Sequence, residues 1–186
     1  MSAAIFSPVV VALLVFWIIR CYNKLVEQRN RVKNAWSQID VQLKRRFDLI
    51  PNLVETVKGY TKHEASILEE FAKARNVYSQ ASSKGDVAGM SEANNMLRST
   101  LSRLIAVSEA YPELKANTHF TSMMSELSET EDKIAYARQF YNDVVLTYNN
   151  TREMFPGSIV ANMFAFKEAE FFKADEASRE NVKVQF

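Results

Sequence analysis

The first stretch of the chain is almost entirely apolar. No charged residue occurs between Met1 and Ile19, and residues 5–19 read IFSPVVVALLVFWII. Nineteen residues in a helix span about 28 Å, close to the roughly 30 Å hydrocarbon core of a bilayer. The pattern predicts a single-pass transmembrane anchor over residues 1–21, and we expect the membrane to be contacted by Ile5, Val9, Leu13, Phe16, Trp17 and Ile19.

Two alternatives to a transmembrane anchor, a cleaved signal peptide and a lipid-modified cysteine, fit this stretch less well. A cleaved signal peptide has basic residues before the apolar run and a small-x-small site after it, but the chain starts MSAAIF and leaves the run as WIIRCYN. A lipid-modified cysteine follows a small residue, whereas Arg20 precedes Cys21. An uncleaved anchor is therefore favoured.

Beyond the anchor, apolar residues recur at heptad spacing from Tyr22 to Tyr78. The series comprises Tyr22, Leu25, Val32, Trp36, Ile39, Leu43, Ile50, Leu53, Val57, Tyr60, Ile67, Phe71, Ala74 and Tyr78. This stripe is typical of a helix in a coiled-coil-like bundle. Because the register survives Pro51, we predict one continuous, kinked helix; a tight turn near Asp48 is the alternative.

Turn residues divide the rest of the chain. The segment SSKGDVAG, residues 82–89, predicts the main loop. A second helix follows, which Pro112 ends, and a third runs from about Phe120 until Pro156-Gly157. We therefore expect a long-helix antiparallel bundle over residues 22–157, a short amphipathic apolar helix over 158–172 and a polar tail over 173–186.

Composition narrows the class of protein. Four glycines and four prolines in 186 residues are too few for loop-rich folds, which favours helices. One cysteine excludes an internal disulfide, and with only two histidines a structural metal site is not expected. A net charge of +1 gives no general attraction to nucleic acid. We expect no cofactor.

Basic residues are concentrated next to the anchor. The juxtamembrane set is Arg20, Lys24, Arg29, Arg31 and Lys33. By the positive-inside rule they predict that the bundle lies in the cytoplasm, although an outward-facing domain stays open. Residues 20–33 are also within reach of anionic lipid.

A second group of charges lies further along the same predicted helix. Lys44, Arg45 and Arg46, together with Glu64, are candidates for a contact between subunits, with lipid contact or a solvated face as alternatives. Arg46 occupies an inward-facing heptad position and needs an acidic partner. The candidates are Glu64 of an adjacent subunit and, within the fold, Glu126 or Glu131.

The segment before the tail is unusually apolar. It predicts a surface for a protein partner or lipid, with capping of the bundle core as the alternative. The candidate residues are Phe155, Ile159, Met163, Phe164, Phe166, Phe171 and Phe172.

Several blocks of the chain resemble the LemA family of membrane-anchored bacterial proteins. They are AWSQIDVQLKRRFDLIPNLVETVKGYTKHE (residues 35–64), SEAYPELKAN (108–117), YNDVVLTYN (141–149) and FPGSIVANMFAFKEAEFF (155–172). Where the family often has Gly-Phe, this chain has Ala165-Phe166. The resemblance implies an all-α fold, in which a transmembrane helix is followed by an elongated antiparallel bundle of about four helices, and it provides no catalytic residue.

No arrangement of residues indicates catalysis, because neither His63 nor His119 has a glutamate three residues earlier, as a di-iron bundle would require. We expect a structural protein of the bacterial inner membrane that forms homo-oligomers through its bundles and organises or shapes the membrane as a scaffold. The alternative is a membrane-tethered sensor or adaptor whose bundle binds a small ligand or an unknown protein partner.

Overall fold

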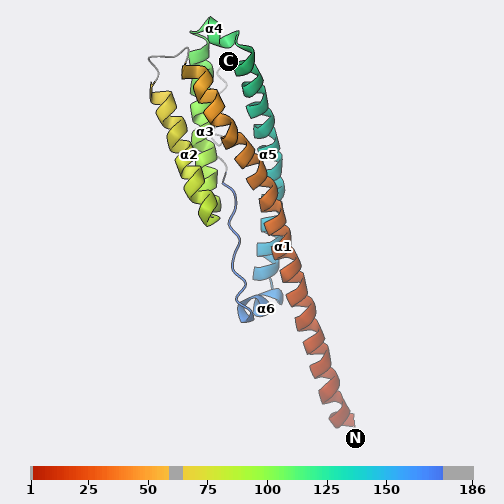
Figure 1. Cartoon of the computed structure of the whole chain (residues 1–186). Helices are drawn as coiled ribbons and strands as arrows, with labels where there is room; N and C mark the ends of the chain where they lie inside the picture. Colours follow the sequence, from red (N-terminus) through yellow and green to blue (C-terminus); the bar gives the residue numbers. More distant parts are fainter. Residues whose placement is uncertain (1, 59–64, 174–186) are drawn as a thin grey trace, which may run out of the picture. The chain divides into compact units, whose positions relative to one another are not determined.

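The computed structural model describes residues 2–58 and 65–173, and these residues are helical apart from the connections and the segment that follows the last helix (Figure 1). The helices are α1 (Ser2–Lys58), α2 (Ala65–Lys84), α3 (Val87–Ser108), α4 (Pro112–Lys115), α5 (Thr118–Glu153) and α6 (Gly157–Met163). This confirms the predicted all-α class with a long apolar N-terminal helix and an antiparallel bundle.

The chain forms two compact units, and α1 and α5 each contribute to both. The first unit consists of Met1–Gln38 and Gln139–Glu170, and the second consists of Ile39–Arg138 and Phe171–Phe186. In the first unit α1 and α5 are antiparallel, because Trp36 meets Tyr141 at 5.5 Å between ring centroids while the earlier Leu25 shares a buried cluster with the later Tyr148.

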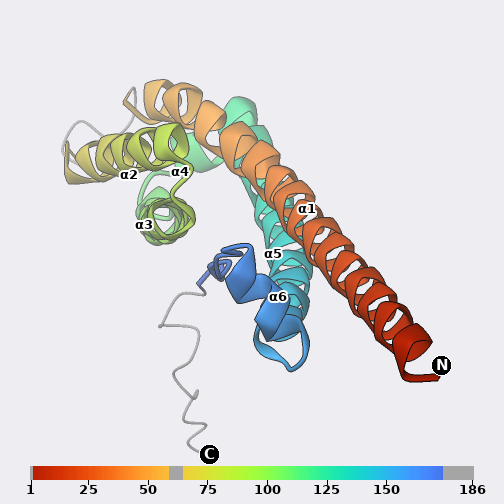
Figure 2. The same ribbon diagram turned by 90° about the horizontal axis from the view of Figure 1, so that it is seen from below.

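In the second unit, the end of α1 packs with α2, α3, α4 and the first part of α5 around one apolar core (Figure 2). Its fully buried members include Leu53, Phe71, Leu97 and Leu104. These residues occur on three different helices at helical spacing, so each helix buries one apolar face.

The predicted continuous helix from Tyr22 to Tyr78 is wrong in its second half. Phe47 of α1 and Tyr78 of α2 stack at 4.2 Å between ring centroids, although 31 residues of straight helix would separate them by about 46 Å. Helix α2 therefore runs antiparallel to the end of α1. The alternative of a turn near Asp48 is also wrong, because α1 continues through Pro51 to Lys58.

The predicted loop over residues 82–89 is shorter than expected, because only Gly85 and Asp86 separate α2 from α3. Gly85 adopts φ +65°, and the amides of Gly85 and Asp86 donate to the carbonyl oxygens of Ser82 and Ala81. This is the Schellman arrangement that ends a helix. The side chain of Asp86 then accepts the amide of Gly89 at 3.0 Å and caps α3.

The predicted helix over residues 158–172 is also wrong beyond Met163. The same capping arrangement ends α6, since Ala165 has φ +52° and the amides of Ala165 and Phe166 donate to the carbonyl oxygens of Asn162 and Ala161. The residues from Ala165 to Lys173 form no helix. They are held instead by hydrogen bonds to side chains, as described below.

Candidate functional site

The N-terminal part of α1 presents its apolar side chains to the surroundings. The helix is long and apolar enough to cross a membrane. Large apolar side chains from Val9 to Ile19 are 43% to 63% exposed, apart from half-buried Trp17 and Ile18. Val9, Leu13, Phe16 and Ile19 are among the exposed residues, as a lipid-facing helix requires, whereas the side chain of Ile5 lies outside the described part.

Helix α6 packs beside the turns of α1 that follow this apolar stretch (Figure 1). Tyr22 makes edge-on ring contacts with Phe164 at 4.8 Å and with Phe166 at 5.7 Å. Trp17, Ile18 and Cys21 pack against the same buried cluster, which also contains Val160 and Ala161. Helix α6 therefore covers one end of the first unit, next to the turn of α1 where its uncharged part ends.

The non-helical segment after α6 is held by three side chains of α5. The hydroxyl groups of Tyr148 and Tyr141 donate to the carbonyl oxygens of Lys167 and Glu170 at 2.7 and 2.8 Å. Asn149 donates to the carbonyl oxygen of Ala169 at 2.9 Å and accepts the Ala169 amide at 3.0 Å. The polar residues of the YNDVVLTYN block thus replace the hydrogen bonds that a helix or strand would provide.

Burial changes the ionisation of one of these tyrosines. Removal of the Tyr141 hydroxyl group from water raises its pKa to about 12, and the carboxylate of Glu170 contributes in the same direction. The neutral phenol that donates the hydrogen bond is therefore the stable form over the whole physiological pH range.

The predicted apolar surface of residues 155–172 divides into exposed and buried members. Phe155 is 81% exposed, and Ile159, Met163 and Phe164 are also exposed. The interpretation is wrong for Phe166 and Phe172, which are 8% and 1% exposed and belong to the interior. Phe171 is exposed but belongs to the second unit.

One neighbouring residue was missing from the predicted set. Met154, at the end of the third predicted helix, is 67% exposed. We call the five exposed large apolar residues of this end of the first unit the α6 patch: Met154, Phe155, Ile159, Met163 and Phe164.

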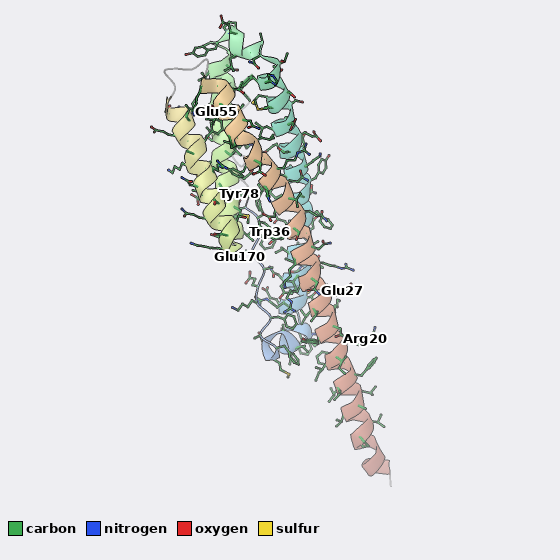
Figure 3. The ribbon with its side chains drawn as sticks, viewed as in Figure 1. Arg20, Glu27, Trp36, Glu55, Tyr78 and Glu170 are labelled. Atoms are coloured by element: carbon green, nitrogen blue, oxygen red, sulfur yellow. The ribbon has the colours of Figure 1, made fainter. Side chains whose placement is uncertain are left out.

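The five juxtamembrane basic residues are all exposed on α1, where Figure 3 labels Arg20. The guanidinium group of Arg29 lies over the ring of Phe166 at 5.2 Å, and that of Arg20 lies 5.7 Å from the ring of Phe16. Arg31 pairs with Glu27 at 2.7 Å, one turn earlier. Lys24 and Lys33 complete a basic collar just after the apolar stretch.

Arg46 lies in the interior of the second unit, so the expectation that it contacts another subunit is wrong. It is 2% exposed, forms an ion pair with Glu131 and donates a hydrogen bond to Asn94 at 2.6 Å. Glu131 was one of the three acidic partners left open by the sequence. Burial lowers the pKa of the Arg46 guanidinium, and the carboxylate of Glu131 opposes that decrease.

Two other residues of that predicted contact, Lys44 and Arg45, are not brought to this pair. Lys44 and Arg45 are exposed on α1, where a contact with another subunit remains a prediction. Glu64 lies outside the described residues.

A cavity of about 460 Å³ opens beside the Arg46–Glu131 pair. Its wall is largely apolar and comes mainly from α3 and α5, and charged groups of both signs line it as well: Arg46, Arg98, Glu109, Lys115 and Glu131. The apolar lining includes Leu101, Ile105, Phe120, Met124 and Leu127. The sequence pattern did not reveal this cavity, because periodicity along one helix does not report an open space between helices.

Two aromatic residues on the outside of α5 were also missed. Tyr136 is 78% exposed and Phe140 is 53% exposed, four residues apart on one helix. Residues at this spacing are neighbours on a helix surface. Aromatic residues outside the heptad positions of the third predicted helix were the signal that could have identified them.

Comparison with known proteins identifies the family. A model of the LemA family matches residues 35–186. The chain belongs to the LemA family. It is 28% identical to Magnetosome protein MamQ 2 of Paramagnetospirillum magneticum over 191 residues, which cover 90% of this chain and 70% of the relative. It is 26% identical to Protein LemA of Metamycoplasma hominis over 160 residues, with 86% and 72% of the two chains covered.

The family match covers every element of the second unit and, in the first unit, α6 and the end of α5, but not the residues of α1 that contact α6. It begins at Ala35 and therefore covers α2 to α6, the Arg46–Glu131 pair and the tyrosines that hold residues 167–170. The alignment with MamQ 2 covers more of the chain than the family match does. Magnetosome protein MamQ of Magnetospirillum gryphiswaldense is 25% identical over 174 residues, which cover 81% of this chain and 64% of the relative.

Proposed function

We propose that this LemA family protein is a structural scaffold of the bacterial inner membrane, anchored by the apolar part of α1 and assembled into homo-oligomers through its bundles. The exposed aromatic pair of Tyr136 and Phe140 carries the proposal. Large apolar groups on the outside of a helix favour association with another protein surface. A common bilayer raises the effective concentration of the copies, so that modest contacts suffice.

The similarity to relatives named magnetosome proteins supports a role at a membrane. The residues gathered in the structure also support a structural role. Tyr141, Tyr148 and Asn149 hold backbone, and Arg46 pairs with Glu131 inside the second unit. The proposal assigns no catalytic activity to the protein.

Mass photometry of the full-length protein in native nanodiscs tests this proposal. A discrete homo-oligomer larger than a dimer is the expected result. The double variant Tyr136→Asp/Phe140→Asp should reduce the mass, because each exposed ring is replaced by a charge. Ser79→Asp, an exposed position of α2, is the control and should leave the mass unchanged. A wild-type monomer or dimer would overturn the scaffold.

The cavity beside Arg46 favours a second candidate function, a membrane-tethered sensor or adaptor. About 460 Å³ lies within the usual size range of small-molecule sites, and a mostly apolar wall with a few charged groups is their usual lining. Native mass spectrometry of the protein in nanodiscs should then detect a bound small molecule. Ser128→Phe would fill the cavity and abolish that binding, whereas the exposed Ser79→Phe would not.

A further inference from the structure

Two uncharged stretches that are far apart in the sequence meet at one end of the first unit. The first is Met1–Ile19, and the second is Met154–Phe166, which reads MFPGSIVANMFAF. Trp17 and Ile18 of the first stretch pack against the cluster that contains Val160 and Phe166 of the second. Tyr22, just beyond the first stretch, makes ring contacts with Phe164 and Phe166. Among the side chains that the structure describes, both stretches keep most of their large apolar ones exposed.

The contacts of α6 fix its depth relative to the anchor. Trp17, Ile18 and Cys21 pack against the cluster that contains Val160 and Phe166. In a membrane-spanning α1 these residues lie where the uncharged stretch gives way to Arg20 and Lys24, which is the boundary between hydrocarbon and headgroups. The α6 patch is consequently level with that boundary.

We propose that the α6 patch inserts into the interfacial layer of the same bilayer that α1 spans, so that the protein has a second, monotopic membrane contact. This inference rests on the proposed membrane anchor. The occupant is lipid, because a bilayer that covers α1 up to Trp17 also reaches the α6 patch. Exposed Phe155, Met163 and Phe164 are the apolar groups that such an interface accepts, and no charge interrupts them.

Two membrane contacts, through α1 and through the α6 patch, would also limit rotation of the first unit about the axis of α1. A single helix leaves the attached bundle free to tilt and turn at the membrane. Insertion of the α6 patch beside it defines one face of the unit as the membrane-facing one. Copies aligned in this way would present the same outward surfaces to one another, which relates the inference to the proposed scaffold.

Site-specific fluorescence in vesicles tests the depth of the patch. In a Cys21→Ser background, Met163→Cys or Phe155→Cys is labelled with an environment-sensitive fluorophore in full-length protein reconstituted into phosphatidylcholine and phosphatidylglycerol. We expect blue-shifted emission, strong quenching by lipids that carry a nitroxide near the headgroup, and protection from aqueous iodide.

Two control positions separate this inference from the anchor. Leu13→Cys should be quenched most by nitroxides at the centre of the acyl chains. Asp143→Cys should be quenched only by iodide, because Trp36 and Tyr141 place this part of α5 about 28 Å further along α1 than Trp17. A Leu13 label that lipid does not quench would overturn the anchor itself.

With the Leu13 result as expected, two results at the patch would overturn the inference. Iodide quenching at positions 155 and 163 like that at position 143 would mean that water covers the α6 patch. Protection from iodide and from both lipid quenchers would mean that another copy of the chain covers it. Circular dichroism of each labelled variant confirms that it is folded, and the two patch positions provide independent readings.

Discussion

Arg46 illustrates how a single charged residue can be inside a helical core without being a site of chemistry. Its heptad position correctly predicted that it points inward, and Glu131 is one of the partners that the sequence proposed. The sequence could not choose between a partner in the same chain and one in another subunit. That choice depends on which helices pack together, since Arg46 and Glu131 are 85 positions apart on α1 and α5.

Removal of this charge should destabilise the protein by about 3 kcal/mol, the low end for a broken buried ion pair. Arg46→Met leaves Asn94 without this donor and leaves Glu131 with only the exposed Arg98. Arg46→Met/Glu131→Met should recover part of the loss, since no uncompensated charge remains. Urea unfolding of the two single variants and the double variant measures the coupling. The exposed pair of Arg103 and Glu70 is the matched control, with an expected coupling below about 1 kcal/mol. Equal coupling in the two pairs would contradict the role of burial.

Tyr141 should make the stability of the fold depend on alkaline pH. Its folded-state pKa of about 12 exceeds the ordinary value of 10.0, so its contribution is complete below about pH 10 and is lost between about pH 10 and 12. Two pKa units correspond to about 2.7 kcal/mol. The difference in free energy of unfolding between wild type and Tyr141→Phe should therefore be constant up to about pH 10 and then shrink. A difference that stays constant from about pH 10 to 12 would contradict this account of Tyr141.

At the scale of helices, the apolar pattern correctly identified which face of α1 and of α2 is buried, but it did not show that the chain reverses direction between them. Helices α1 and α2 each bury one apolar face in the same core. The heptad phase of α2 in the sequence coincides with that of α1, so register alone could not distinguish a continuous helix from a hairpin. The neglected signal was Gly59, which directly follows the last residue of α1. Glycine is a common helix stop. Pro51, by contrast, lies within α1 and does not end it.

The length of α6 was overestimated for a related reason. Its apolar residues continue at plausible helical spacing to Phe172, but Ala165 takes a left-handed conformation that ends the helix. The segment beyond it is stabilised by Tyr141, Tyr148 and Asn149 of α5, which are contacts across 19 to 29 residues of sequence. Local spacing does not encode such contacts, so only the helix start was predictable.

The two helix ends with the same cap give a matched pair of variants. Gly85 and Ala165 have φ of +65° and +52° in equivalent positions. Ala165→Gly should raise the free energy of unfolding by about 1 kcal/mol, because glycine adopts this conformation without steric cost. Gly85→Ala should lower it by a similar amount, and the effect belongs to the backbone alone because no atom lies within 4 Å of the added Cβ. Thermal unfolding measures both, and a loss of stability in Ala165→Gly would contradict this account of the cap.

At the scale of the whole molecule, the apolar N-terminal stretch and the all-helical class were predictable, because composition and period report them directly. The cavity of the second unit and the meeting of the two uncharged stretches were not, since both arise from packing between distant segments.

The membrane orientation remains a prediction from charge. The basic collar carries five exposed cations within about fifteen residues of the apolar stretch, the distance over which such charges are retained on the cytoplasmic side.

A fluorescent protein fused to the C-terminus should therefore fluoresce in cells, whereas a C-terminal alkaline phosphatase, which is active only outside the cytoplasm, should be inactive. Replacement of Arg20, Lys24, Arg31 and Lys33 by glutamine should weaken this bias and increase phosphatase activity. Arg29 is kept, because it lies over the Phe166 ring and its loss would also disturb packing. Lys44→Gln/Arg45→Gln removes charges beyond the reach of the rule and should change neither reporter. An active phosphatase on the wild-type chain would instead place the bundle outside the cytoplasm, with the α6 patch against the outer leaflet.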